Sequence, residues 1–403
     1  MPTTTSRITP ALIPSRDDIV ARATALREIL QEEAPAADQQ RRLADRVINE
    51  ITDAGLLRLT TPTRFGGYDA NMRTFLEVAV ALGRGCTSAS WVSSVWNVGS
   101  FIVSLFPDDV QDQVWGQNPD TRAALVLGGM KPDVEWVDGG AVITGEWPYA
   151  SGSLHSEWVT VLLAEKPVDG PPKLTLALLQ ADKVTVRDTW FFTGMRGTGS
   201  NTIVADRVFV PSERLVPFLP IANGAAGTLP GQHTRYQDCL SGIFSIGLIG
   251  PLIGGAQAVL QYVIEKGPTR PVAFSTFPNQ AASPSFQLDV AAAARRIDTA
   301  LFHAGRIADV VDEFAAAGKD IDLLTRSRLK ADSAHVAREC RDAIDTLLSA
   351  YGSSAFAETN PLQRIWRDVN VGSRHVAFGM GIPDQQYGRA LVGGNPCDIS
   401  YLV

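Results

Sequence analysis

Three patterns of apolar and polar positions follow one another along the chain, and the first of them has the period of a helix. Up to about residue 120, apolar residues recur near the period of a helix, as Leu43, Val47 and Ile51 do. The segment 88–106 is apolar on almost every side, which is typical of a buried helix. This first part therefore predicts helices that cover residues 17–32, 41–57, 72–85 and 88–106.

From about Arg122 to Pro220 the pattern changes to short runs rich in β-branched and aromatic residues, which Gly, Pro and Asp separate. Such runs predict strands, here over residues 123–129, 141–147, 158–166, 174–180, 183–190 and 201–211. The Gly- and Ala-rich residues 222–232 then indicate a linker.

After residue 236 the helical period returns over residues 241–266, 284–317, 321–351 and 361–379, which suits a four-helix bundle. The expected α+β chain is thus an N-terminal helical domain (1–121), a middle β domain (122–232) and a C-terminal helical bundle (233–403). The stretch from Ile243 to Ile264 approaches membrane-spanning length, but it contains Pro251 and Gln257 and leads into a polar helical pattern. We therefore expect a buried bundle helix there and no membrane span.

Composition removes several classes of function. The net charge of -7 argues against a nucleic-acid-binding protein, which needs a clustered basic face. The four cysteines are scattered, without a CxxC pair or a histidine at metal-ligand spacing, so we expect reduced thiols and no metal site. The N-terminus lacks the apolar core of a signal peptide, and we expect a cytoplasmic protein.

Two distant stretches carry the candidate chemistry. Residues 145–164 place Trp147, Tyr149 and Ser151 at the end of a strand-like run, and residues 364–379 place His375 alone in an apolar, helix-like run. Aromatic walls, a hydroxyl and an imidazole suit a pocket that holds a flat redox cofactor and moves a proton beside it. The plainer alternatives are a strand end with core aromatics and a Ser-Gly turn, and a helix histidine bonded to a backbone carbonyl.

Three further stretches, in order, carry a resemblance to a known family: AGLLRLTTPTRFGGYDA (54–70), the segment 190–216 and AYGSSAFAETNPLQRIWRDV (350–369). Together they resemble the acyl-CoA dehydrogenases, over about residues 40–395. The resemblance implies that family's fold, which has an N-terminal helical domain, a middle β-barrel or sandwich and a C-terminal four-helix bundle.

The chain departs from true dehydrogenases where their catalytic glutamate would stand, because that neighbourhood reads VNVGSRHVAFG. The WPYASG and RDVNVGSRH segments are instead similar to the flavin-dependent monooxygenases of this fold, the oxygenase components of two-component systems. That resemblance implies hydroxylation of an aromatic or polycyclic substrate by reduced flavin (FADH2 or FMNH2) and O2, through a C4a-hydroperoxyflavin. It also implies a separate NAD(P)H-dependent flavin reductase and a homotetramer. The remaining alternatives are N- or S-oxygenation and an acyl-CoA dehydrogenase-like reaction.

By the same resemblance, His375 and Ser151 are the candidate catalytic residues, with Ser151 bonded to flavin N5. Since histidine ordinarily titrates near neutral pH, we expect His375 to give the activity a pH dependence there. Arg270 is expected to reach the flavin phosphates of a neighbouring subunit. The other candidate cofactor contacts are Trp147, Tyr149, Ala150, Gly152, Arg196, Ser200, Phe274, Gln287 and Ser353. The candidate substrate contacts are Trp91, Val95, Asn97 and His155. No GxGxxG fingerprint is present, so no Rossmann nicotinamide site is expected.

Overall fold

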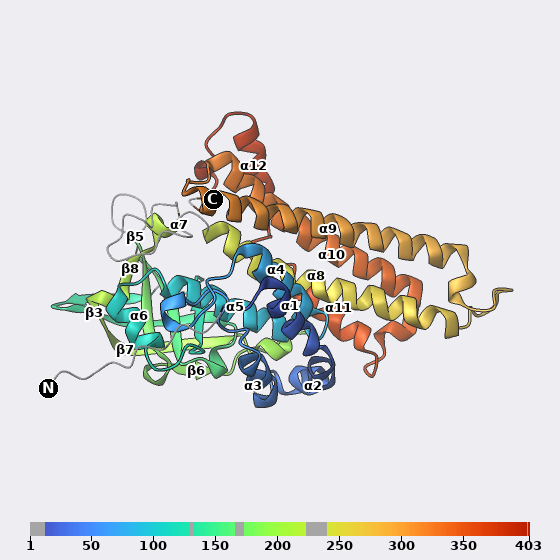
Figure 1. Cartoon of the computed structure of the whole chain (residues 1–403), viewed down its shortest axis with the longest axis horizontal. Coiled ribbons are helices and arrows are strands. Elements are labelled where there is room, and N and C mark those ends of the chain that lie inside the picture. Colours follow the sequence, from blue (N-terminus) through green and yellow to red (C-terminus); the bar gives the residue numbers. More distant parts are fainter. Residues whose placement is uncertain (1–12, 129–131, 166–172, 223–239, 401) are drawn as a thin grey trace.

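Helices, two sheets and a projecting bundle follow one another along the chain in a computed structural model that describes residues 13–128, 132–165, 173–222, 240–400 and 402–403. The sheets lie at one end of the molecule, and the bundle extends away from them at the other (Figure 1). The order predicted from the sequence is therefore confirmed. The predicted boundary near residue 232 lies outside the described residues.

The N-terminal part contains helices α1 (Arg16–Ala25), α2 (Arg27–Gln40), α3 (Asp45–Asp53), α4 (Met72–Gly83), α5 (Thr87–Val103) and α6 (Asp108–Trp115). A capping box between Ser15 and Asp18 starts α1. The helix expected to start at residue 41 begins only at Asp45, as α3. Residues 38–40 end α2 instead, and Arg41 after them is left-handed at φ 58°.

Two four-stranded sheets form the β part. One has the order β1 (Ala123–Val126), β4 (Trp158–Glu165), β5 (Lys173–Gln180), β8 (Leu215–Pro217), and the other β2 (Asp133–Val137), β3 (Gly140–Ala150), β7 (Asn201–Pro211), β6 (Thr185–Arg187). All the pairings are antiparallel except β1 with β4. The sequence patterns did not predict β2 and β8, because β2 is largely exposed and β8 is only three residues long.

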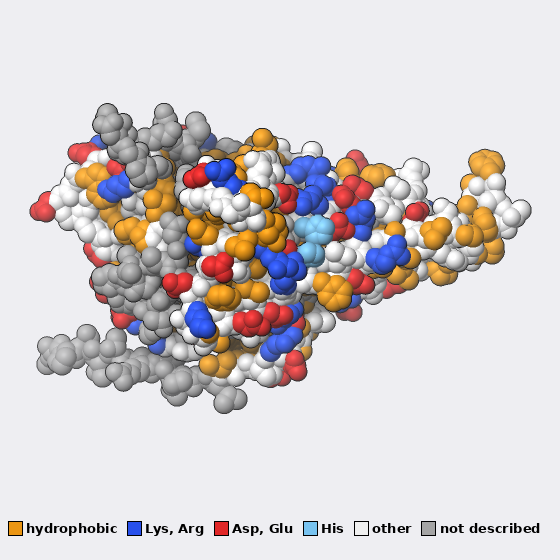
Figure 2. All heavy atoms as spheres, turned by 90° about the horizontal axis from the view of Figure 1, so that it is seen from above, with side chains coloured by type: hydrophobic (Ala, Val, Ile, Leu, Met, Phe, Trp, Pro, Cys, Tyr) orange, Lys and Arg blue, Asp and Glu red, His pale blue; other side chains and the backbone are white. Residues whose placement is uncertain are grey.

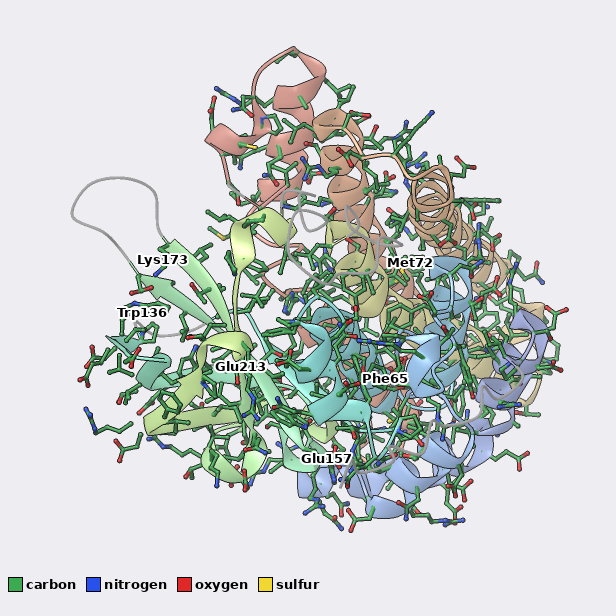
Figure 3. The ribbon with its side chains drawn as sticks, turned by 60° about the vertical axis from the view of Figure 1, so that its left-hand side comes forward. Phe65, Met72, Trp136, Glu157, Lys173 and Glu213 are labelled. Atoms are coloured by element: carbon green, nitrogen blue, oxygen red, sulfur yellow. The ribbon has the colours of Figure 1, made fainter. Side chains whose placement is uncertain are left out.

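The first sheet is the middle of three layers. Along β4, Val159, Val161 and Leu163 pack into the core between the two sheets. On the other face, the strands contribute Leu174, Leu176 and Leu178 to the core shared with the helices. Burial on both faces explains the continuous apolar runs of β4 and β5. At the outer edge of the sandwich Trp136 and Lys173 lie side by side, with the Lys173 ammonium 3.8 Å from the ring centre (Figure 3).

Helix α5 attaches the helices to the first sheet, and every residue from Thr87 to Val103 except Val95 is buried. Gly99 lies against β1 so closely that a Cβ there would stand 1.9 Å from the Ala123 carbonyl oxygen. A side chain at that position would therefore force the helix and the strand apart.

The bundle consists of α8 (Leu240–Lys266), α9 (Pro284–Ala317), α10 (Leu323–Tyr351) and α11 (Pro361–Gly372), followed by α12 (Ile382–Leu391). The helical stretch Leu240–Thr269 is long and apolar enough to cross a membrane, but 83% of its most apolar window is buried inside the protein. It lies against α4, α5, α9 and α10, as the core helix of the bundle. The helix expected over 361–379 ends at Gly372, with Ser373 as its cap, so His375 lies in the turns that follow and the prediction of a helical position was wrong.

Candidate active site

The loop from Gly194 to Ser200 holds the candidate site together. Met195 is left-handed at φ 53°, which is unusual for a residue with a side chain, and both of its backbone polar groups are bonded. Its N–H donates to Asp368 at 2.6 Å, and its carbonyl accepts from the Trp190 indole at 2.8 Å and from the Thr198 hydroxyl at 2.7 Å. These bonds hold the strained residue in one position.

Three buried hydroxyls lead from this loop to the end of β3. Ser151 and Ser200 lie 2.6 Å apart, and Ser200 and Thr198 also lie 2.6 Å apart. The Gly152 N–H donates to the Thr198 carbonyl at 3.0 Å, which adds a backbone bond between the two segments. Ser151 is therefore held by contacts with residues that are far from it in the sequence.

His375 lies in the turn after α11, with its ring edge against Trp91 at 5.8 Å and against Phe378 at 6.2 Å between ring centres. Its Nδ1 accepts the Ala377 N–H at 3.2 Å. A neutral ring that accepts at Nδ1 carries its proton on Nε2. Burial of the ring lowers the pKa of His375 to about 4, although the residue as a whole keeps some exposure. The expectation of titration near neutrality was therefore wrong, and His375 stays neutral there as an Nε2–H donor.

The Met195 side chain and the Trp91 ring both lie close to Gly372. A Cβ on Gly372 would touch the Met195 side chain at 2.6 Å and the Trp91 ring at 3.4 Å. Met195 belongs to the hydroxyl-bearing loop, and Trp91 packs against His375. The two stretches singled out in the sequence thus share one neighbourhood, connected through Met195 and Trp91.

Asp368 is the buried carboxylate of this neighbourhood. Burial raises its pKa to about 6, against the opposing effect of the Met195 N–H. Its second oxygen accepts from Ser88 of α5 at 3.4 Å. One carboxylate thereby joins α11, α5 and the loop, and it is occupied by these bonds rather than free to act as a base.

A set of aromatic rings lies beside Ser151. Trp190 and Phe192 are stacked with 3.9 Å between ring centres, and Tyr149 meets both of them edge-on at 5.9 and 6.1 Å. Tyr149 is 59% exposed and left-handed at φ 68°. An exposed aromatic surface next to a buried hydroxyl cluster is a suitable place for a planar ligand.

The other residues of the WPYASG segment face inward. Trp147 is fully buried in the sandwich core, where its indole donates to the Leu162 carbonyl at 2.9 Å. Ala150 lies in the same core. Gly152 is left-handed at φ 75°, and a Cβ there would meet the Trp96 ring nitrogen at 2.7 Å. The structure thus places Trp147 and Ala150 away from any ligand surface.

The candidate substrate residues on α5 also divide into residues that serve the packing of the protein and one that contacts His375. Asn97 is fully buried and accepts from the Leu59 N–H at 3.0 Å, while its amide group donates to the Leu56 and Ser93 carbonyls, so it ties α5 to the segment after α3. Val95 is partly buried against the helical core. Trp91 alone among the α5 candidates contacts His375.

His155 lies over the Trp96 ring, edge-on at 6.5 Å. Its Nδ1 is 3.7 Å from the Asp45 carboxylate, and its buried Nε2 has no hydrogen-bond partner among the described residues. Burial lowers its pKa, and the nearby Arg42 lowers it further. Ser153 of the same loop also has a buried hydroxyl with no partner among the described residues, so two polar atoms near Ser151 are unsatisfied.

Arg196 supports the loop instead of facing a ligand. Its guanidinium donates to the Asp38 carbonyl at 2.8 Å and to the Phe192 carbonyl at 3.1 Å. Asp38 also forms an ion pair with Arg367 at 2.8 Å. The cluster of α2, the loop and α11 is therefore cross-linked by two arginines on one aspartate.

The remaining cofactor candidates lie at the outer tip of the bundle, where α8 leads to α9 and α10 ends (Figure 1). Arg270 lies over the Tyr351 ring at 3.7 Å and donates to Ser354 at 2.7 Å and to the Tyr351 carbonyl at 3.1 Å. Phe274 is fully exposed, and Gln287 and Ser353 are exposed as well. The space-filling view shows apolar side chains along this projecting end (Figure 2).

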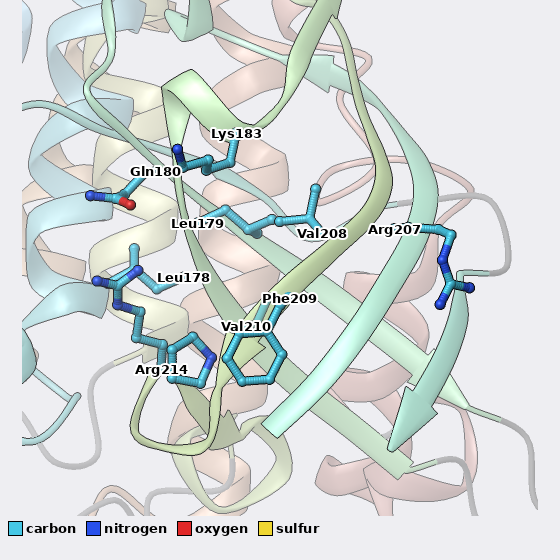
Figure 4. Close-up of a pocket in the computed structure, with 10 residues that line it drawn as sticks. Leu178, Leu179, Gln180, Lys183, Arg207, Val208, Phe209, Val210 and Arg214 are labelled. Carbon is cyan, nitrogen blue, oxygen red and sulfur yellow. The ribbon is translucent and has the colours of Figure 1, made fainter. Parts of the chain in front are cut away.

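Two cavities of the protein lie away from this site. One, of about 450 Å³, lies between the end of β5 and the Arg207–Pro211 part of β7 (Figure 4). The hydroxyl cluster is at the other end of β7, roughly 23 to 36 Å away at about 3.3 Å per residue. The second is an open groove of about 820 Å³ between α1, α4, α8 and α9.

Sequence reasoning missed Met195, Asp368 and the Trp190–Phe192 stack as parts of this site. Three consecutive aromatic residues in a loop, Trp190 to Phe192, are a signal that could have drawn attention to the stack. A carboxylate on the apolar side of a helix, as at Asp368, is another. The left-handed Met195 has no local signal.

Comparisons with known proteins agree with this architecture. Residues 18–117 match the N-terminal domain of the acyl-CoA dehydrogenases, and residues 246–379 match their C-terminal domain. The oxygenase subunit HsaA of a flavin-dependent monooxygenase from Mycobacterium tuberculosis is 31% identical over 355 residues, 86% of this chain and 88% of HsaA. The oxygenase component of the FADH2-dependent resorcinol hydroxylase from Rhizobium is 27% identical, over 96% of this chain and 97% of its own length.

The solved structure of XiaF from Streptomyces, in complex with FADH2 and glycerol, has a TM-score of 0.89 to this chain at 31% identity. The match covers 94% of this chain and 96% of XiaF.

Proposed function

We propose that the cluster around Ser151 and His375 is the active site of this protein. The chain belongs to the acyl-CoA dehydrogenase family and, within it, to the flavin-dependent monooxygenases. The protein is the oxygenase component of a two-component monooxygenase that hydroxylates an aromatic substrate with reduced flavin and O2. A separate flavin reductase supplies the reduced flavin.

The residues present fit a flavin. Tyr149 and Phe192 offer an exposed aromatic surface, with the buried Trp190 ring packed behind it, and the adjacent Ser151 hydroxyl is held at a fixed position by Ser200. The unsatisfied buried atoms of Ser153 and His155 show that this loop has polar capacity left for a ligand or water. When bound, reduced flavin supplies the oxygen-activating chemistry. The chain's own part is to bind the ring, hold Ser151 at flavin N5 and keep water out.

The tautomer of His375 favours the role of a hydrogen-bond donor over that of a general base. With Nδ1 bonded to the Ala377 N–H, the ring presents Nε2–H, and its low pKa disfavours the gain of a proton. A neutral donor in a dry pocket stabilises negative charge that develops on an oxygen. We assign His375 this donor role, in preference to that of a general base on the substrate.

The substrate pocket in this proposal lies between α5 and the flavin. Trp91 packs against His375 and forms the aromatic wall of this pocket. His155 is a second polar group at the edge of the pocket. An apolar aromatic or polycyclic substrate suits these surroundings, since α5 brings no cation for a phosphate-bearing substrate.

A homotetramer is part of the same proposal. Arg270 is already oriented by Tyr351, Gln280 and Ser354 at a tip that carries exposed Phe274 and Phe277. Such apolar exposure is typical of an interface between subunits. Arg270 is then available to the flavin phosphates of a neighbouring subunit.

The observation that carries the proposal is the chain of three buried hydroxyls that ends at Ser151 beside an exposed aromatic surface. The test is an assay of NADH oxidation by the purified chain, alone and then with a flavin reductase and FAD. Hydroxylation of a phenol such as resorcinol or p-hydroxyphenylacetate is expected only with the reductase. NADH-dependent turnover by the purified chain alone would contradict the proposal.

A further inference from the structure

The hydroxyls of Ser151, Ser200 and Thr198 form a chain whose direction is set at one end. Thr198 lies 2.7 Å from the Met195 carbonyl, and a carbonyl oxygen can only accept. The single hydroxyl proton of Thr198 is therefore used on Met195. The Trp190 indole donates to the same carbonyl and fixes its position.

This first bond determines the next two. With its proton on Met195, Thr198 can only accept from Ser200, which lies 2.6 Å away. Ser200 must donate there, because two lone pairs facing each other at that distance would repel. Ser200 then has no proton left for Ser151, so Ser151 must donate to Ser200 across their 2.6 Å contact.

Burial prevents water from reversing this order. Ser151, Ser200 and Thr198 are all buried, and a reversed order would leave the Thr198 and Met195 oxygens facing each other at 2.7 Å with no proton between them. The order is therefore Ser151 to Ser200 to Thr198 to the Met195 carbonyl, and the Ser151 oxygen presents only lone pairs to a ligand.

We propose that this ordered hydroxyl relay makes Ser151 an obligate hydrogen-bond acceptor, and that it thereby selects reduced over oxidised flavin. The inference rests on the proposed function, which places flavin N5 at Ser151. Reduced flavin carries a hydrogen on N5 and can donate to Ser151. Oxidised flavin carries a lone pair on N5, which would face the lone pairs of Ser151 without a proton between them.

Ser200 and Thr198 are thus positioning residues that act through Ser151. Their effect differs from that of a packing residue, since it depends on the redox state of the ligand. The selection is useful to an enzyme that receives reduced flavin and must release oxidised flavin after each turnover.

The experiment measures the dissociation constants of oxidised FAD, and of anaerobic, dithionite-reduced FAD, for the purified full chain. In Ser200→Ala the Ser151 proton is free to turn outward and donate to oxidised N5. We expect the ratio of the two constants to fall about five- to tenfold, mainly because oxidised FAD binds more tightly. Thr198→Val unlocks the relay one step earlier and should lower the ratio less, while Thr198→Ser keeps the chain and should restore the wild-type ratio.

Thr202→Val is the matched control. Thr202 forms a hydroxyl pair with Thr189 at 2.8 Å, next to this cluster but with no bond to Ser151. Its replacement should leave the ratio unchanged. Melting temperatures show whether each variant is folded, and Thr198→Val provides an independent test if Ser200→Ala is not.

The possible failures are distinct. If the wild-type chain binds neither form of FAD, the proposed function is wrong. If the wild type prefers reduced FAD and the folded Ser200→Ala and Thr198→Val variants keep the same preference, the relay does not select the redox state and the inference is overturned.

Discussion

The loop around Met195 and the tip of the bundle both contain residues expected to contact flavin. Within a single chain, the residues of the loop are held in place by their contacts, whereas most of those at the tip are exposed. At the loop, Met195, Asp368, Ser200 and Thr198 are buried and hydrogen-bonded to one another. At the tip, Phe274, Gln287 and Ser353 are exposed, and Arg270 is oriented by its own loop.

The difference separates two tasks. A group that directs a proton must be fixed to within a few tenths of an ångström, and buried reciprocal bonds provide this within one chain. A group that holds phosphates needs mainly charge and reach, and it can be supplied across an interface. We therefore expect changes in the loop to alter the chemistry, and changes at the tip to alter affinity and assembly.

The largest effect is expected at His375. His375→Ala removes the Nε2–H donor and should lower the rate of hydroxylation about 10²–10³-fold, the usual loss for a donor that stabilises developing charge. His375→Gln keeps an N–H donor without a base of similar basicity, so it should retain much more activity than the alanine variant. The measurement is the rate of product formation from a phenol that the wild type hydroxylates, with reductase and FAD present.

Equal losses in the two His375 variants would contradict the donor role and favour a base. Because the pKa of His375 is about 4, its replacement should also leave the pH profile of the residual activity unchanged between about pH 6 and 8.

A smaller effect is expected at the tip. Arg270→Ala should raise the dissociation constant of reduced FAD about tenfold or more, since a charge-assisted bond to phosphate is lost. Arg270→Lys keeps the charge but loses the forked arrangement of donors, so its dissociation constant for reduced FAD should lie between those of the wild type and Arg270→Ala. At saturating FAD the ratio of product to peroxide should stay at the wild-type value, because the tip does not touch the reacting end.

Titration calorimetry or fluorescence with anaerobic FADH2 measures the Arg270 effect, and light scattering records the assembly. An unchanged affinity in a folded, assembled Arg270→Ala variant would remove the tip from the flavin site.

The smallest effect concerns stability at Asp368. Burial raises the pKa of this carboxyl to about 6, so the folded state favours its protonated form. Its contribution to stability is therefore present at low pH and is lost as the pH rises from about 4, the pKa in the unfolded chain, to about 6. Asp368→Asn keeps an oxygen for the Met195 N–H and removes the titration.

The wild type should thus lose stability relative to Asp368→Asn across that interval, by about 1.4 kcal/mol for each unit of pKa shift. The lowered pKa of His375 changes the stability with pH in the opposite direction, but this contribution is the same in both proteins and cancels in the comparison. Denaturant unfolding of both proteins at several pH values measures the difference, and parallel curves would show that Asp368 does not titrate there.

The sequence predicted the layers and the bundle well because their periods are local. Pro284–Ala317 was expected as a helix and is one, since its apolar positions repeat over many turns. The end of α11 was missed although Gly372 is its last residue, because the cap at Ser373 is right-handed and no left-handed glycine stops the helix.

The orientation of side chains near Ser151 was not predictable from alternation. Trp147 and Tyr149 are two residues apart, so a regular strand would place both on one face. The pairing with β7 is irregular between Trp147 and Ala150, and Tyr149 is left-handed, which turns it outward while Trp147 remains buried. Such a bulge depends on the partner strand and not on the local pattern.

Contacts between residues far apart in the sequence were the other feature that could not be predicted. Met195 and Asp368 are 173 positions apart, and their bond follows from how α11 packs on the loop. In the same way, Gly99 is explained by the close approach of α5 to β1, which the local sequence does not reveal.

The central claim is that reduced flavin binds with its N5 at Ser151. The most direct test is to mix the anaerobic complex of the chain and reduced FAD with oxygen, and to record when the visible absorbance of oxidised flavin appears. The wild type should delay this appearance relative to free reduced FAD, and Ser151→Ala should shorten the delay several-fold, since one hydrogen bond is worth about 1 kcal/mol. Equal delays in the wild type and a folded Ser151→Ala variant would contradict the account and place the flavin elsewhere.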